Sequence, residues 1–164
     1  MTKKTVLIVE DSIGFSELMQ FVVEDEGYRG VVFPLEDNFI KWVDKEKPNA
    51  IIMDLALNRM NGFDFIHELK EHPKHKTIPI IVITGRDLSV KDVAELKLHD
   101  IQYLRKGRVD MNEIHKAIKD CLEKEEKVAP VVAKAAKLTE DKPKAEKPKV
   151  EKAKTPRVAK AKKK

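Results

Sequence analysis

The chain has 164 residues, 41% of them apolar, which suits one globular domain with a hydrophobic core and is too little for two large domains. Its single cysteine, Cys121, excludes an intrachain disulfide, and no apolar run approaches the roughly 20 residues that span a bilayer, so we expect a cytoplasmic protein without a membrane partner. The net charge of +5 divides into −4 over residues 1–123 and +9 over residues 124–164. An acidic body followed by a basic segment indicates two different physical roles.

Short apolar runs alternate along the body with segments of helical spacing. The runs lie at residues 6–9, 30–33, 50–53, 79–83 and 101–104, and their continuous apolarity is typical of parallel strands covered on both faces. The helices are marked by Phe15, Leu18, Met19 and Val22; by Phe39, Ile40 and Val43; by Phe63, Ile66 and Leu69; by Val90, Val93, Ala94 and Leu96; and by Met111, Ile114, Ile118, Cys121 and Leu122. Asp110 is the predicted N-cap of the last helix. Five strand–helix units predict a doubly wound α/β fold, and we expect its five-stranded parallel sheet to have the flavodoxin-like order 2-1-3-4-5.

The C-terminal segment has a different composition. After about Lys124 there is no Phe, Trp, Tyr, Ile, Met or Gly, and Leu138 is the only leucine. Such a segment cannot bury enough apolar area to offset its ordering entropy. We therefore predict a folded domain over residues 1–124 and a disordered Lys/Ala/Pro-rich tail over residues 125–164, which resembles the basic tails of linker histones.

Polar residues follow the predicted strands at the points where functional groups gather in a doubly wound sheet. They are Glu10 and Asp11 after the first strand, Asp54 after the third, Thr84 after the fourth and Lys106 after the fifth. Converging carboxylates raise one another's pKa unless a cation intervenes, and hard oxygen ligands suit Mg²⁺. A lysine and a hydroxyl then complete a pocket for a dianionic group of oxygens.

Four segments in this order resemble the receiver domains of response regulators, from residue 5 to about residue 123. They are Val-Leu-Ile-Val-Glu-Asp-Ser at 6–12, the acceptor segment at 51–62 with its Met60 and Gly62, Ile-Val-Ile-Thr-Gly at 81–85, and Tyr-Leu-Arg-Lys at 103–106. The separations of thirty residues from Asp54 to Thr84 and fifty-two from Asp54 to Lys106 match the usual spacing of that family.

The resemblance implies a phosphoacceptor of a two-component system, a signalling protein and not an enzyme. Asp54 would take a phosphoryl group from a histidine kinase or a phosphotransfer protein, with self-phosphorylation from small donors and autodephosphorylation as intrinsic reactions. Mg²⁺ would be held by Glu10, Asp11, Asp54 and the main-chain carbonyl of Ala56. Lys106 would pair with Asp54 and then with the phosphoryl group.

The same resemblance implies a switch. Thr84 would donate a hydrogen bond to a phosphoryl oxygen and move toward it, and Tyr103 would change rotamer with it. This would alter a surface of the fourth helix, fifth strand and fifth helix that binds a downstream protein. We also expect a persistent phosphorylated state, because Ala56 has no side chain that could orient a water molecule and Arg86 is long enough to cover the phosphoryl group.

Two residues depart from the family pattern. Asn58 stands where the family usually has Pro, and Gly107 follows Lys106 where Pro is usual. Two alternatives therefore stay open: a pseudo-receiver that binds partners without phosphorylation, and a nucleic-acid-associated protein that acts through the tail. The tail would bind nucleic acid or another polyanion through its charge.

Overall fold

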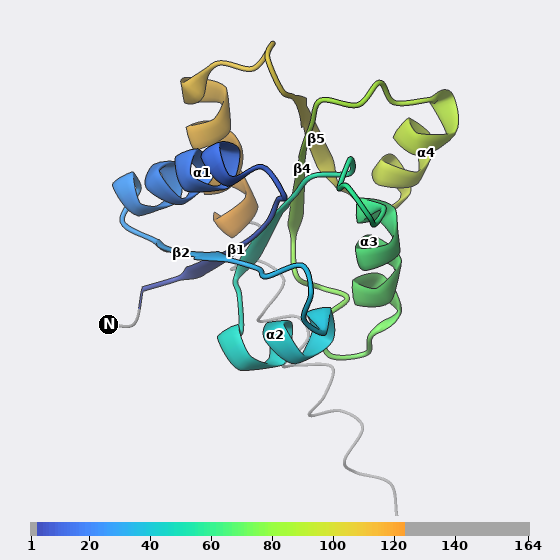
Figure 1. Cartoon of the computed structure of the whole chain (residues 1–164), viewed down its shortest axis with the longest axis horizontal. Coiled ribbons are helices and arrows are strands. Elements are labelled where there is room, and N and C mark those ends of the chain that lie inside the picture. Colours follow the sequence, from blue (N-terminus) through green and yellow to red (C-terminus); the bar gives the residue numbers. More distant parts are fainter. Residues whose placement is uncertain (1–2, 124–164) are drawn as a thin grey trace, which may run out of the picture.

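The computed structural model describes residues 3–123, and the predicted tail with its polyanion binding lies outside them. Strands and helices alternate along the chain, as Figure 1 shows. The elements are β1 (Thr5–Val9), α1 (Ile13–Asp25), β2 (Arg29–Val32), α2 (Phe39–Glu46), β3 (Ala50–Met53), α3 (Gly62–Glu71), β4 (Ile80–Thr84), α4 (Val90–Leu98) and β5 (Gln102–Arg105). A further helical segment covers residues 111–123.

The five strands form one parallel sheet in the order β2-β1-β3-β4-β5. Ile8 in β1, for example, is aligned with Val32 on one side and with Ile52 on the other. The predicted doubly wound fold and strand order are confirmed. Since all the strands are parallel, their carboxyl ends lie along one edge of the sheet.

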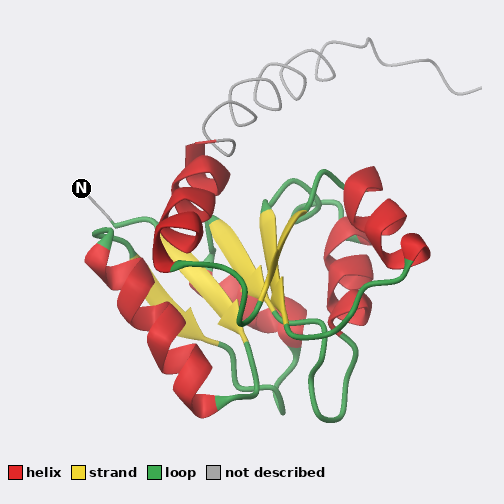
Figure 2. Ribbon diagram, turned by 90° about the horizontal axis from the view of Figure 1, so that it is seen from above, coloured by secondary structure: helices red, strands yellow, loops and turns green. Residues whose placement is uncertain are grey.

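Helices cover both faces of the sheet (Figure 2). Leu7 and Val9 of β1 pack into a core with α2, α3 and α4, whereas Val6 and Ile8 pack into a second core with α1 and the 111–123 segment. Successive residues of a strand point to opposite faces of the sheet. Because helices cover both faces, all four side chains are buried. The continuous apolarity of the runs therefore reflects two covered faces, as the sequence predicted.

Local caps determine where several helices begin. The side chain of Asn61 accepts a hydrogen bond from the amide of Phe63 at the start of α3, 3.3 Å away. The predicted N-cap Asp110 accepts from the amide of Glu113 at 2.8 Å, and the Glu113 carboxylate accepts in return from the Asp110 amide at 3.1 Å. This reciprocal pair is a capping box that opens the 111–123 segment.

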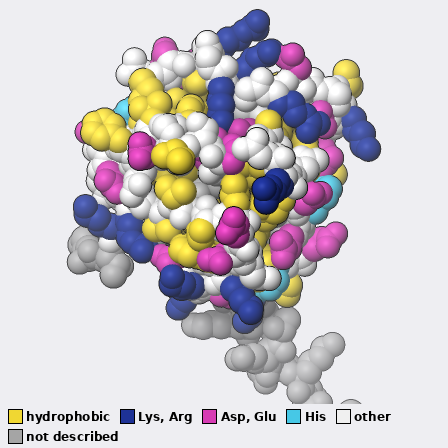
Figure 3. All heavy atoms as spheres, in the orientation of Figure 1, with side chains coloured by type: hydrophobic (Ala, Val, Ile, Leu, Met, Phe, Trp, Pro, Cys, Tyr) yellow, Lys and Arg dark blue, Asp and Glu magenta, His cyan; other side chains and the backbone are white. Residues whose placement is uncertain are grey.

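The helical segments marked by apolar spacing are present, but in three of them not every marker residue faces the core. Leu18 of α1 is 39% exposed, and the buried apolar residues of that helix are Met19, Val22 and Val23. In α4, Val90 is 89% exposed and Leu96 is the one buried residue of the nine. Met111, at the start of the last helical segment, is 40% exposed. The face of the molecule seen in Figure 3 likewise carries hydrophobic side chains mixed with charged ones.

The described residues contain no helix that is both long enough and apolar enough to cross a membrane. Cys121 is buried in the core formed with α1, as the helical spacing of the sequence predicted.

Candidate functional site

The predicted site residues meet at the carboxyl edge of the sheet. Glu10 and Asp11 follow β1, Asp54 follows β3, and Lys106 follows β5. One carboxylate oxygen from each of the three acidic residues lies within 4.8 Å of the others, which is a spacing that one metal ion could bridge.

Main-chain amides hold each of these carboxylates in place. Asp54 is 4% exposed, and its Oδ1 accepts from the amide of Ala56 at 2.9 Å. Glu10 is 6% exposed, and its Oε1 accepts from the Ser12 amide at 3.0 Å. The half-buried Asp11 uses Oδ2 to accept from the Asn58 amide at 2.9 Å. The cluster is therefore oriented by loop backbone as well as by charge.

Lys106 lies between two of the acids. Its Nζ donates to Glu10 Oε2 at 2.6 Å and to Asp54 Oδ2 at 2.7 Å, and it lies 4.3 Å from the centroid of the Phe15 ring. The lysine side chain is only 20% exposed, so these charge-assisted hydrogen bonds form away from most of the solvent.

Burial and pairing shift the pKa values of Glu10, Asp54 and Lys106. Burial raises the pKa of Glu10, although the bond from Lys106 opposes this. Burial also acts to raise the pKa of Asp54, but the Ala56 amide, Lys106 and the Thr84 hydroxyl outweigh it, so the pKa is lowered. For Lys106, burial favours the neutral form, yet bonds to Asp54 and Glu10 raise its pKa. Asp54 is thus kept ionised, as a nucleophile or a metal ligand requires.

The arrangement fits a divalent cation. Within the described residues the cluster brings three carboxylates together with one ammonium group, that of Lys106. Carboxylate oxygens with solvent access on the Asp11 side are the ligands that Mg²⁺ prefers, since it usually keeps several waters. The Ala56 amide donates to Asp54, and the Ala56 carbonyl stays a predicted ligand.

Close packing beneath Asp54 explains why position 62 is a glycine. A Cβ atom added there would lie 2.3 Å from the carbonyl oxygen of Asp54 and 2.7 Å from Cα of Leu55. The Gly62 amide also donates to the Leu55 carbonyl at 3.2 Å. Any side chain at this position would therefore push the segment that carries Asp54.

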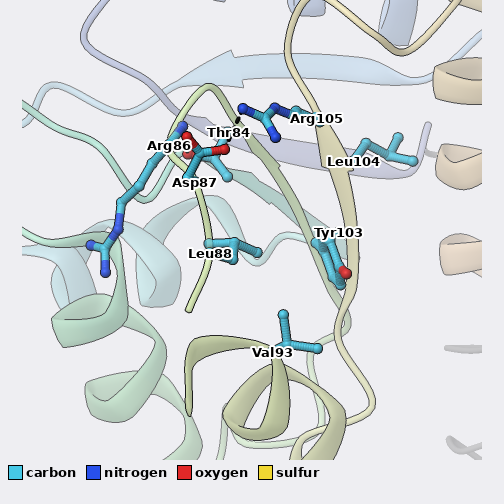
Figure 4. Close-up of a pocket in the computed structure, with 8 residues that line it drawn as sticks. All are labelled: Thr84, Arg86, Asp87, Leu88, Val93, Tyr103, Leu104 and Arg105. Atoms are coloured by element: carbon cyan, nitrogen blue, oxygen red, sulfur yellow. Dashed lines mark hydrogen bonds and ion pairs between the residues drawn. The ribbon is translucent and has the colours of Figure 1, made fainter. Parts of the chain in front are cut away.

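Thr84 and Tyr103 line one pocket of about 170 Å³ beside the acidic cluster. Figure 4 shows it between the β4–α4 loop, β5 and α4, with Leu88 and Val93 among its walls. Thr84 is 1% exposed, whereas Tyr103 is 42% exposed. An ion pair between Arg105 and Asp87 joins β5 to the loop at the edge of this pocket.

The two departures from the family pattern leave the site assembled. Gly107 has a φ of 78°, a left-handed conformation that favours glycine and that proline cannot adopt. The Lys106 amide still bonds the Thr84 carbonyl at 2.9 Å, and its ammonium reaches Asp54. The Asn58 amide donates the hydrogen bond that Asp11 accepts, and a proline at this position would have no amide hydrogen to donate.

Arg86, which the sequence suggested could cover a phosphoryl group, is directed toward α3 and α4. Its guanidinium pairs with Asp92 at 3.2 Å and lies 5.9 Å from the centroid of the Phe63 ring. Figure 4 shows the side chain directed away from the pocket. The pairing with Asp92, which belongs to the N-terminal capping box of α4, accounts for this direction.

Three contributors to the site were missed from sequence. Phe15 was identified only as a marker of the first helix, and its contact with Lys106 carries no sequence signal. The Asn58 amide and the Gly62 packing are backbone features. Gly62 was named in the segment that resembles receiver domains, but its packing against Asp54 was not predicted.

The chain is similar to known receiver proteins. Residues 6–119 match the family described as response regulator receiver domain. An uncharacterized 14.6 kDa protein of Leptolyngbya boryana is 31% identical over 85 residues, which cover 52% of this chain and 65% of that protein. Response regulator Rcp1 of Synechocystis is 30% identical over 114 residues, covering 64% of this chain and 78% of Rcp1.

Longer relatives and solved structures agree with this. The alkaline phosphatase synthesis transcriptional regulatory protein PhoP of Bacillus subtilis is 26% identical over 77% of this chain, which spans only 52% of PhoP. The crystal structure of a response regulator receiver domain protein from Methanospirillum hungatei superposes with a TM-score of 0.67, at 22% identity, covering 77% of this chain and 98% of that one. At that identity the structure supports the fold alone.

Proposed function

Because the chain belongs to the response regulator receiver domain family, we propose that it is a phosphoacceptor of a two-component system in which Asp54 takes the phosphoryl group. The observation that carries this proposal is the position of Asp54, a buried carboxylate kept ionised by the Ala56 amide and Lys106. Such a carboxylate is a competent nucleophile. Because the phosphoryl group would stay on the protein after transfer, we propose that the protein acts as a signalling element.

The proposed reaction uses the residues of the cluster in turn. An oxygen of Asp54 forms a bond to phosphorus as the bond from phosphorus to the donor nitrogen of a phosphohistidine breaks. The Lys106 ammonium, now 2.7 Å from Asp54 Oδ2, would move to an oxygen of the phosphoryl group. The Thr84 hydroxyl would donate to another oxygen. The contribution of these groups is positioning and charge stabilisation.

A magnesium ion suits the remaining negative charge. Glu10, Asp11 and Asp54 would hold it, with the Ala56 carbonyl as a further proposed ligand. The ion would supply charge neutralisation for the transferring group. The chain's own contribution is to orient the three carboxylates through the amides of Ser12, Asn58 and Ala56.

We place the binding surface for a downstream protein on α4, β5 and the 111–123 segment. Large apolar side chains are exposed on all three: Val90 and Leu98 on α4 (89% and 80%), Tyr103 on β5 and Met111. Thr84 and Tyr103 share the pocket behind this surface. Movement of Thr84 toward a phosphoryl group would change the space open to Tyr103, and so change the surface that a partner meets.

Incubation with acetyl phosphate and Mg²⁺, followed by intact mass measurement, tests the function. We expect wild type to gain one phosphoryl group and Asp54→Asn to gain none. Equal uptake by both proteins would show that the acceptor lies elsewhere. A wild type that takes no phosphate from acetyl phosphate or from a histidine kinase would favour the pseudo-receiver, to which the departures at Asn58 and Gly107 point.

A second function, polyanion binding, is favoured by the charge of residues 124–164. This segment has a net charge of +9 and contains no aromatic residue that could stack on bases. We propose that it contacts nucleic-acid phosphates and reads little sequence. DNA affinity across a salt series should fall steeply for the full chain and be much lower for residues 1–124. Equal affinities of the two proteins would remove nucleic acid from the partners.

A further inference from the structure

The face of the Phe15 ring covers the ammonium group that serves the acceptor. Lys106 Nζ lies 4.3 Å from the ring centroid, while its hydrogen bonds go to Glu10 and Asp54. Phe15 lies in the first turn of α1, half-buried, and packs against the core formed with the 111–123 segment. The ring is therefore held by the helix and the core, independently of the lysine that it covers.

Lys106 depends on its side-chain contacts for its direction. It begins the turn after β5, and the next residue, Gly107, has the left-handed φ of 78°. The main chain is tied to β4 by the bond from the Lys106 amide to the Thr84 carbonyl. Beyond that bond four methylene groups are free to choose other rotamers, so the position of Nζ rests on the two carboxylates and the ring.

Phosphorylation would change the contact of Lys106 with Asp54 and leave its contact with the Phe15 ring. Once an Asp54 oxygen is bound to phosphorus, the ammonium exchanges its carboxylate partner for a phosphoryl oxygen. The ring face attracts the cation before and after this exchange, because the attraction comes from the ring quadrupole. The low exposure of the lysine side chain strengthens such an attraction, since little water competes with it.

We propose that Phe15 is a positioning residue for phosphoryl transfer, which keeps the Lys106 ammonium at the acceptor while its hydrogen-bond partner changes. The inference rests on the proposed function of Asp54. It predicts that the π face matters and not only the volume of the side chain.

Three variants test this with acetyl phosphate and Mg²⁺. Phe15→Leu keeps an apolar side chain and removes the ring. A ring-fluorinated phenylalanine at position 15 keeps the shape and weakens the quadrupole. Phe21→Leu removes the other ring of α1, which is 67% exposed, and serves as the control. The NMR resonances of the Lys106 side chain report its contact with the ring in the unphosphorylated protein.

We expect Phe15→Leu to slow phosphorylation about threefold to tenfold and the fluorinated protein to be slowed in the same direction, with Phe21→Leu at the wild-type rate. The Lys106 resonances should lose their ring-current shift in Phe15→Leu. The inference is overturned if Phe15→Leu and the fluorinated protein are both phosphorylated at the wild-type rate. It is also overturned if Phe15→Leu is slow but the fluorinated protein is phosphorylated at the wild-type rate. If Phe15→Leu unfolds, the fluorinated protein decides. A wild type that takes no phosphate refutes the proposed function itself.

Discussion

The ammonium of Lys106 lies 2.7 Å from Asp54 Oδ2, although fifty-two residues separate the two in sequence. The same ammonium lies 2.6 Å from Glu10 Oε2. Parallel strands bring the three residues together because β1, β3 and β5 all end at one edge of the sheet. The pairing explains why Asp54 can be both buried and ionised.

Replacing Lys106 by Met should destabilise the protein at neutral pH by about 1–3 kcal/mol, since two buried carboxylates lose their cation. The pKa of Asp54 is lowered in the folded state, so the pair contributes stability above the ordinary value of 3.8. That contribution is lost as the pH falls through the lowered pKa. Urea denaturation at neutral and at acid pH measures both effects.

Lys116→Met is the matched control, because Lys116 is exposed on the 111–123 segment. It should leave the free energy of unfolding unchanged at both pH values. A Lys106→Met protein that is as stable as this control at neutral pH would mean that the ion pairs contribute nothing to the fold.

The Asn58 amide should matter for Mg²⁺ binding, whereas its side chain should not. Asn58→Pro removes the donor that holds Asp11 within the carboxylate cluster, and we expect Mg²⁺ affinity to fall about fivefold, or ~1 kcal/mol. Asn58→Ala keeps the amide and should bind as wild type does. Isothermal titration calorimetry distinguishes them, and equal affinities in the two variants would contradict the role of the amide.

Gly62→Ala should cost about 1–3 kcal/mol, because the added Cβ meets the Asp54 carbonyl and the loop must shift. Phosphorylation should slow as well, since Asp54 moves with its backbone. Gly14→Ala in α1 has open space around the new atom and should be neutral, or stabilising by up to about 1 kcal/mol. Thermal unfolding of both variants checks this; equal melting temperatures would disprove the steric account.

Phosphate loss should be slow, because the exposed Ala56 offers no side chain to orient water at the acceptor. Ala56→Asn should raise the rate of loss by about threefold or more. Ala94→Asn, on the exposed side of α4, should leave it unchanged. Decay of the phosphorylated protein, followed by intact mass, decides; an unchanged rate in Ala56→Asn would end this explanation.

The sequence predicted the fold from the apolar runs, and it predicted the acidic cluster from the polar residues that follow those runs. Continuous apolar runs indicated strands covered on both faces, and a parallel sheet brings the residues after them to one edge. Which side of each helix faces the core was harder to predict. Apolar spacing does not reveal that Val90 and Leu98 face solvent, because it does not distinguish a core stripe from an exposed one. Nor could it predict the direction of Arg86, which depends on Asp92.

The most direct test of the phosphoacceptor role is to locate the phosphoryl group chemically. Borohydride reduces an aspartyl phosphate to homoserine and leaves free carboxylates intact, so peptide mapping after treatment with acetyl phosphate, Mg²⁺ and borohydride reads out the acceptor. We predict homoserine at position 54 in wild type, dependent on Mg²⁺ and absent without the phosphodonor. Homoserine at position 11 instead, or at no position in a protein that gains phosphate, would contradict the assignment of Asp54.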